Sequence, residues 1–232
     1  DGSNGATASD GIPDGYAWRA TDSGSTAGLS LGDGAVPAGT LISILSAGGD
    51  IKLHGRSSGT TTDPGILTQE NVLIDAGAGT ISVNGYSSVG HGIELAFGGS
   101  NQQNVFRSSS NDGTKAAISI IGTTTVALYD GFRMTKAGSS LIQSEGSGNI
   151  VIEGASTTGN ALDFRNTQIL AASGIITLEG VSTSGTGIAL TNADIGKRTS
   201  ATAIQGVTPL ASSSADVGLK SDSFSFSISE SL

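Results

Sequence analysis

Two glutamates, Glu153 and Glu179, occupy the same place in two successive copies of a repeated segment. If each copy forms one winding of a parallel β structure, equivalent residues of neighbouring windings lie about 5 Å apart. A carboxyl pair at that separation suits a retaining glycosidase, and the proximity of like charges would raise the pKa of one member. The equivalent residues of earlier copies are Ile121, Asn84 and His54, which build no polar groove. We therefore expect two exposed, hydrated carboxylates, and keep the acid pair of a carbohydrate-active enzyme as the alternative.

His91 lies in the segment VGHGIEL, between two glycines. This segment resembles the Gly-His-Gly motif of polygalacturonases, which are parallel β-helices. The resemblance implies a histidine that works beside aspartates and an Arg-x-Lys motif, but neither an Asp-Asp pair nor Arg-x-Lys accompanies His91 here. Other copies of the repeat carry Asn160 and Thr186 at this corner. The sequence therefore predicts a solvated corner histidine without a catalytic role.

Fragments of a calcium-binding turn occur in SAGGDIKL and SSSNDGTK, but a calcium β-roll needs a Gly- and Asp-rich nonapeptide in tandem. The absence of cysteine excludes disulfides, a zinc–thiolate site and a cysteine nucleophile. We expect no catalytic residue, no cofactor and no bound metal.

Pairs of hydroxyl residues follow the first strand of each copy. We expect them to form a ladder whose hydroxyls satisfy backbone groups at a corner; the alternatives are a weak carbohydrate- or surface-contacting strip, or sites of glycan attachment. The pairs are Ser57-Ser58, Ser87-Ser88, Thr124-Thr125, Ser156-Thr157 and Ser182-Thr183.

The positions of all of these residues follow from an internal repeat in the sequence. Its template is Gly-x-Ile-x-(Val/Ile/Leu)-x-Gly-x-Ser-(Ser/Thr), which most copies continue with x-Gly-x-(Gly/Ala)-(Ile/Leu)-x-(Leu/Phe). The copies include GDIKLHGRSS, GTISVNGYSSVGHGIEL, GNIVIEGASTTGNALDF and GIITLEGVSTSGTGIAL, with weaker copies at Ala116 and Ser200. Each copy holds three short alternating strands separated by Gly and Ser/Thr corners. Two longer copies carry polar inserts that we expect to be loops, at 98–113 and 129–140.

Such a unit cannot close a core alone, but stacked copies can bury continuous aliphatic rows. We therefore predict an all-β fold, a right-handed parallel β-helix (β-solenoid) of about six to seven coils of three short strands. An antiparallel β-sandwich, which also has many short strands, would not repeat one inward residue type in one register. The predicted rows are Ile51/Ile81/Ile118/Ile150/Ile176 and Leu53/Val83/Ile120/Ile152/Leu178.

Both ends of the chain depart from the template. Residues 1–20 hold the only tryptophan, Trp18, and we expect this segment to cap the first coil of a solenoid that spans 21–210. Residues 211–232 end in alternating Phe224, Phe226 and Ile228, which predicts a half-buried strand. That strand either caps the solenoid or adds to the edge of another copy.

The composition limits the function classes. Of 232 residues, 36 are glycine and 13% are charged, about half the usual fraction, which disfavours both helices and disorder. The net charge of −9 disfavours nucleic acid and anionic membranes as partners. No window approaches the ~20 apolar residues of a membrane span. Because the chain shows neither an initial Met nor a signal peptide, we expect a processed or excised piece.

The coil pattern over residues 24–208 resembles the β-helical shaft of filamentous-haemagglutinin-type exoproteins, which are bacterial adhesins exported by two-partner secretion. The resemblance implies a secreted or cell-surface location and an adhesive or scaffold role. The motifs of that family's amino-terminal secretion domain are not evident, so this would be an internal or carboxy-terminal piece, or a shorter relative. We expect a non-enzymatic structural protein that self-associates as an oligomer or filament, with host or surface glycans as possible partners. A passive phage- or virus-like fibre segment is a third class, separable by its trimeric mass.

Overall fold

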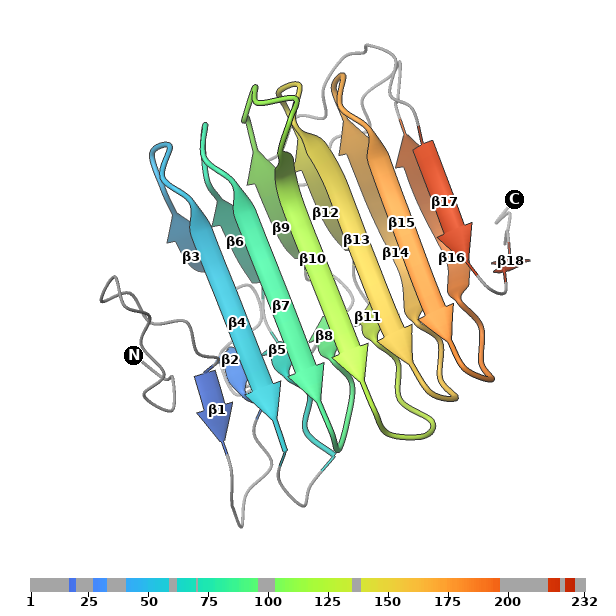
Figure 1. The fold of residues 1–232 in the computed structure, drawn as a ribbon. Helices are drawn as coiled ribbons and strands as arrows, with labels where there is room; N and C mark the ends of the chain where they lie inside the picture. Colours follow the sequence, from blue (N-terminus) through green and yellow to red (C-terminus); the bar gives the residue numbers. More distant parts are fainter. Residues whose placement is uncertain are drawn as a thin grey trace.

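The computed structural model describes residues 17–19, 27–32, 41–58, 62–69, 71–95, 103–134, 139–196, 217–221 and 224–227. In these residues the chain is all-β and the strands stack in parallel as a solenoid, with two sheets facing each other (Figure 1). The described part contains no helix that could cross a membrane.

One sheet has seven strands, each the first strand of its turn. In spatial order they are β1 (Ala17–Arg19), β4 (Ile51–Ser57), β7 (Ile81–Ser87), β10 (Ala116–Thr124), β13 (Asn149–Ser156), β15 (Ile176–Ser182) and β17 (Val217–Ser221).

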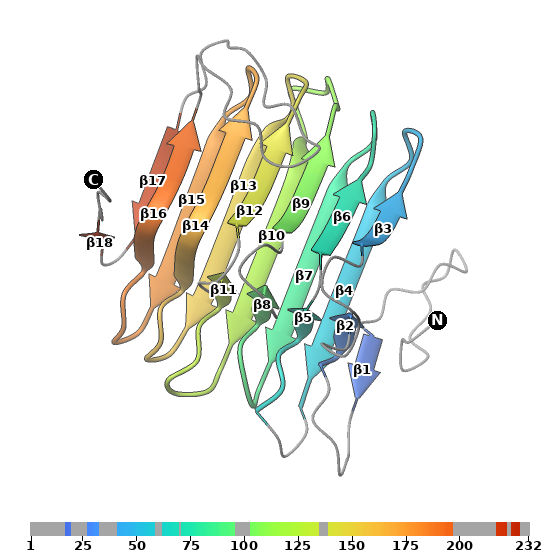
Figure 2. The same cartoon turned by 180° about the vertical axis from the view of Figure 1, so that it is seen from behind.

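The opposite sheet holds the second and third strands of each turn. The second strands are β2 (Leu29–Leu31), β5 (Ile66–Thr68), β8 (Ile93–Leu95), β11 (Phe132–Met134) and β18 (Phe224–Ser227). The third strands are β3 (Leu41–Leu45), β6 (Asn71–Asp75), β9 (Gln103–Ser108) and β12 (Ser139–Ser144). In β14 (Leu162–Ala171) and β16 (Ile188–Gly196) the second and third strands run together without a break, as Figure 2 shows from behind.

Five turns lie between β4 and the end of β16; the strands β1, β2 and β3 precede them, and β17 and β18 follow them. The predicted solenoid is confirmed, and the expected count of six to seven coils was slightly too high. In Figure 1 the chain runs down the front sheet and back up the rear as it advances from β4 to β15, so the coil is right-handed. This is the hand favoured for parallel crossover connections.

The predicted aliphatic rows form the core. Strand pairing aligns Ile118 with Ile81 and Ile150, and Ile150 with Ile176, in one unbroken register. Ile150 and Ile152 are completely buried. Burying one such side chain stabilises the fold by roughly 1.5–3 kcal/mol, so the rows are the main source of its stability.

The recurring glycine late in the first strand is required by a close approach of two backbones. At Gly154, for example, an added Cβ would overlap the carbonyl oxygen of Ala161, which lies across the first corner. The same overlap occurs in every complete turn, at Gly55, Gly85, Gly122, Gly154 and Gly180. Their common role is to let the chain fold back on itself tightly.

Asn166 and Asn192 make the second bend and were not singled out from the sequence. Both have positive φ angles, 49° and 51°, a conformation that asparagine tolerates better than most residues. The Nδ2 group of Asn192 donates a hydrogen bond to Oδ1 of Asn166, at 2.7 Å. The segments RNTQIL and TNADIG carry asparagine at the same point, which was the available signal.

The predicted hydroxyl ladder is present in the first residue of four of the pairs, Ser87, Thr124, Ser156 and Ser182. Ser87 Oγ donates to the carbonyl of Asp63 (2.8 Å) and accepts from the N–H of Gly90 (2.8 Å). Ser182 Oγ donates to the carbonyl of Gly159 (2.8 Å) and lies 3.1 Å from Ser156 Oγ. These hydroxyls are buried, so they satisfy corner backbone groups and offer no exposed strip to a ligand.

Two expected loops contain core strands. The segment predicted as a loop at 98–113 includes β9, whose Phe106 is buried, and 129–140 includes β11, whose Phe132 is buried. Their insertions interrupt the template spacing, although inward alternation is kept. The copy at Ser200 lies outside the described residues, and the described strand that follows β15 in its sheet is β17.

We predict that Gly154→Ala destabilises the protein by about 1–3 kcal/mol or more, because the new methyl group overlaps fixed backbone. Gly113→Ala is the matched control, because a Cβ added there would lie 3.8 Å from the nearest atom, the carbonyl oxygen of Ser147. Urea unfolding of both variants measures the effect. Equal midpoints for the two variants would contradict the close approach.

Candidate functional site

Glu153 and Glu179 stand directly opposite each other on the outer face of β13 and β15. The predicted stacking is therefore confirmed, and the pair continues a row through Ile121, Asn84 and His54. Both glutamates are partly buried rather than fully exposed. The pairing gives two adjacent carboxyl groups on the outer face of a sheet, with an isoleucine on the next strand.

Strand pairing gives the positions of the aromatic residues that were predicted to take part in interactions. Trp18 in β1 is aligned with Arg56 in β4. Phe224 and Phe226 in β18 are aligned with Ile188 and Leu190, two core positions of β16. Ile228 lies outside the described residues. The pairing of β17 and β18 with this chain's own strands agrees with the capping alternative for the tail.

His91 is buried, with 5% of its surface exposed, so the prediction of a solvated corner histidine was wrong. The turn that follows β10 covers it. That turn has seven residues, 125–131, whereas the equivalent turns after β7 and β13 have five. Its Tyr129 packs edge-on against the imidazole, with ring centroids 5.1 Å apart. The equivalent turn after β4 is also long, with eight residues, 58–65, so turn length by itself did not reveal the burial.

Hydrogen-bond donors face both ring nitrogens of His91. The backbone N–H of Asp130 donates to Nδ1 at 2.9 Å, and Nη1 of Arg133 lies 2.9 Å from Nε2. A protonated ring would turn an N–H group toward each donor, so this environment disfavours the imidazolium form, whereas a neutral ring can accept a hydrogen bond at one nitrogen. Burial, followed by the positive charge of Arg133, lowers the pKa of His91 to about 4.

Asp130 is the acidic neighbour of this histidine. Its Oδ1 accepts a hydrogen bond from the N–H of Asn160 at 2.7 Å, and its Oδ2 lies 3.6 Å from His91 Nδ1. Burial raises the pKa of Asp130 to about 6, against the opposing effect of the Asn160 hydrogen bond. At neutral pH the pair is thus a carboxylate beside a neutral ring, not a salt bridge.

A column of alternating charge runs beside this pair, on the outward positions of three successive second strands. Strand pairing aligns Glu94, Arg133 and Asp163, and Arg133 Nη1 lies 3.8 Å from Glu94 Oε1. Asp163 is 2% exposed and accepts hydrogen bonds from Nε and Nη2 of Arg165, at 3.1 and 2.9 Å. Burial raises the pKa of Glu94, and Arg133 partly offsets this.

We name the residues His91, Glu94, Asp130, Arg133, Asp163 and Arg165 the ionic cluster. It contains the carboxylates and the imidazole that acid–base chemistry would use, but these groups are mostly engaged with one another. Its geometry is suited to joining three turns of the solenoid. No local motif in the sequence marks the cluster, because its members come from β8, β11, β14 and two corners.

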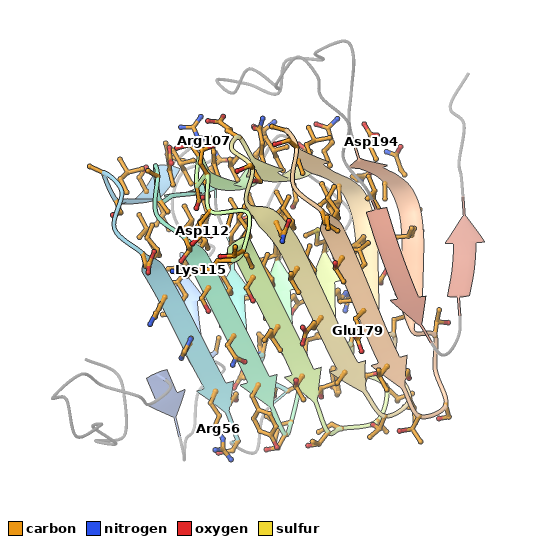
Figure 3. The ribbon with its side chains drawn as sticks, turned by 45° about the horizontal axis from the view of Figure 1, so that its top comes forward. Arg56, Arg107, Asp112, Lys115, Glu179 and Asp194 are labelled. Atoms are coloured by element: carbon orange, nitrogen blue, oxygen red, sulfur yellow. The ribbon has the colours of Figure 1, made fainter. Side chains whose placement is uncertain are left out.

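The described residues contain no group of three or more histidines, aspartates or glutamates arranged to hold a metal ion. Among the charged side chains labelled in Figure 3, Asp112 and Lys115 form an ion pair at 3.5 Å, and the others lie apart. Arg56 is at one end of the sheets, and Arg107 and Asp194 are at the other (Figure 3). No family model, curated protein or solved structure matches this chain.

Acid should affect the two central groups in opposite directions. Because the pKa of His91 is lowered, its contribution to stability is present above pH 6.5 and is lost as the pH falls toward 4. Because the pKa of Asp130 is raised, its contribution is present below pH 3.8 and is lost as the pH rises through 6. Each group contributes roughly 3 kcal/mol to the free energy of unfolding, so in the wild-type protein the two opposite pH dependences nearly cancel.

We predict that Asp130→Asn makes the free energy of unfolding fall steeply between pH 6.5 and 4, relative to wild type. His91→Asn should produce the reverse slope, with stability rising as the pH falls from 6 to 3.8. Urea unfolding at several pH values gives both profiles. Parallel pH profiles for wild type and both variants would contradict the assignment.

Proposed function

We propose that this chain is a non-enzymatic, extracellular structural β-solenoid, a shaft or subunit of a surface filament or adhesin. The observation that carries the proposal is the unbroken register of its aliphatic rows. From β4 to β15 every first strand pairs in parallel with the next, and the same inward positions are stacked throughout. Turns joined in this way form a stiff body whose corners and outer faces are free to vary.

Polar chemistry in the described residues also supports a structural role. The buried corner hydroxyls form hydrogen bonds with backbone groups, and the residues of the ionic cluster form hydrogen bonds and ion pairs with one another. The low charge, the absence of cysteine and the coil pattern agree with the filamentous-haemagglutinin-type shafts that the sequence resembles. Such a protein acts by geometry: it presents side chains at fixed spacing, with surface glycans or other copies of the chain as partners.

Electron microscopy of the purified chain tests the proposal. We expect elongated particles or filaments, which join through end edges or through the tail strand at 222–230. If the tail is the connector, deletion of residues 219–232 should abolish filaments. Filaments that persist after the deletion would exclude the tail as the connector, and compact, non-associating particles would argue against the filament role.

A carbohydrate-active enzyme is the second candidate, favoured by the confirmed stacking of Glu153 on Glu179. We predict no turnover of acidic or neutral polysaccharides by the wild-type chain. Reducing-end assays with wild type, Glu153→Gln and Glu179→Gln measure this. Turnover that both substitutions abolish, while Asn84→Ala retains it, would replace the structural proposal by an enzymatic one.

A further inference from the structure

The strand β3 is the last strand of its sheet at the amino-terminal end. It pairs with β6 on one side, and within the described residues no strand pairs with its other edge. Figure 2 shows β3 at the outer end of the row formed by β12, β9 and β6. Its outward side chains Leu41 and Leu45 are 56% and 66% exposed. A free, apolar edge of this kind is a template for another strand.

The backbone groups that face this edge follow from the pairing with β6. The N–H of Ser46 donates to the carbonyl of Asp75 at 2.8 Å. In a parallel ladder alternate residues face the same neighbour, so Ile42 and Ile44 also direct their N–H and C=O groups toward β6. The N–H and C=O groups of Leu41, Ser43 and Leu45 therefore point to the free edge.

The sequence of β3 is self-complementary. Leu-Ile-Ser-Ile-Leu reads the same in both directions, so antiparallel pairing with a second copy places each residue opposite one of its own type. Ser43 faces Ser43 of the second copy on the two-fold axis, and Leu41 faces Leu45. Because these residues carry the free N–H and C=O groups, they form the hydrogen-bonded pairs of the new ladder.

Charge does not oppose this contact, although each chain has a net charge of −9. No residue of β3 is charged. The acidic residue aligned with Leu45 on the neighbouring strand is Asp75, whose Oδ2 accepts a hydrogen bond from Nε of Arg107 at 3.0 Å. Two copies therefore meet at an uncharged edge beside a neutralised carboxylate.

We propose that β3 pairs antiparallel with β3 of a second copy, so that two solenoids join at their amino-terminal ends around a two-fold axis. This inference rests on the self-association in the proposed function and names its edge and its partner. The contact uses the same surface in both copies and therefore closes as a dimer. A single five-residue edge buries little area, so we expect a micromolar Kd.

Light scattering and sedimentation of the full chain measure its mass. Wild type should be dimeric at high concentration and dissociate on dilution. Ser43→Lys should be monomeric, since like charges would face each other on the axis. Ser43→Pro should also be monomeric, because it removes an N–H that is free in the single chain. Ser82→Lys is the matched control, an outward serine on the central strand β7, and should remain dimeric.

A charge-swap experiment tests the two-fold register. Ser43→Lys and Ser43→Asp should each be monomeric alone, and their mixture should restore a dimer with one copy of each. Wild type that is monomeric at every concentration would overturn the proposal, as would a dimer that survives both Ser43→Lys and Ser43→Pro. A mixture that stays monomeric would overturn the register.

The outcomes separate this inference from the proposed function. Filaments that form equally from wild type and Ser43→Lys, with both chains equally dimeric, would leave the structural function standing and overturn pairing through β3. Dimers that depend on Ser43 but never build filaments would support β3 pairing and contradict a filament role.

Discussion

Parallel hydrogen bonding between consecutive turns is the constraint from which the rest of this structure follows. The inward rows of each first strand are aligned with those of the next, with one irregularity in β10 between Ala116 and Ile118, so a slip of one position along the rows would turn every inward side chain to the solvent. The aliphatic rows ending in Ile176 and Leu178 depend on that register and, by their burial, also enforce it. Backbone pairing and hydrophobic burial therefore stabilise the same arrangement.

The recurrence of glycine and serine at the corners is a consequence of the narrow cross-section of the solenoid. Two backbones come so close at the first corner that Gly154 and its equivalents cannot carry a side chain. Their neighbours must satisfy carbonyl and N–H groups that leave the ladder, and buried hydroxyls such as Ser87 and Ser182 do this. Glycine and serine thus recur in the template for different physical reasons, space in one case and hydrogen bonding in the other.

Stacking also governs the polar residues, because outward positions of successive turns are neighbours. Opposite charges in one column attract, as Glu94, Arg133 and Asp163 show. Glu153 and Glu179 are two like charges in the same relation. At the amino-terminal end the same periodicity leaves β3 paired with β6 on one edge and, among the described residues, with no strand on the other.

The sequence by itself determined the solenoid, the inward rows, the alignment of Glu153 with Glu179 and the role of the corner hydroxyls, because each depends on a pattern that repeats along the chain. Only the tertiary structure showed the features that differ from one turn to the next. His91 is buried by a turn two residues longer than those after β7, β13 and β15, and the ionic cluster joins residues from three turns whose spacing differs. Strands β9 and β11 were predicted as loops, because insertions shift them away from the spacing of the repeat. The alternation of their inward and outward side chains is nevertheless kept. The repeat in the sequence determines which residues of successive turns are stacked on one another. Contacts made by turns of unusual length depend on the path of the folded backbone, which the repeat does not specify.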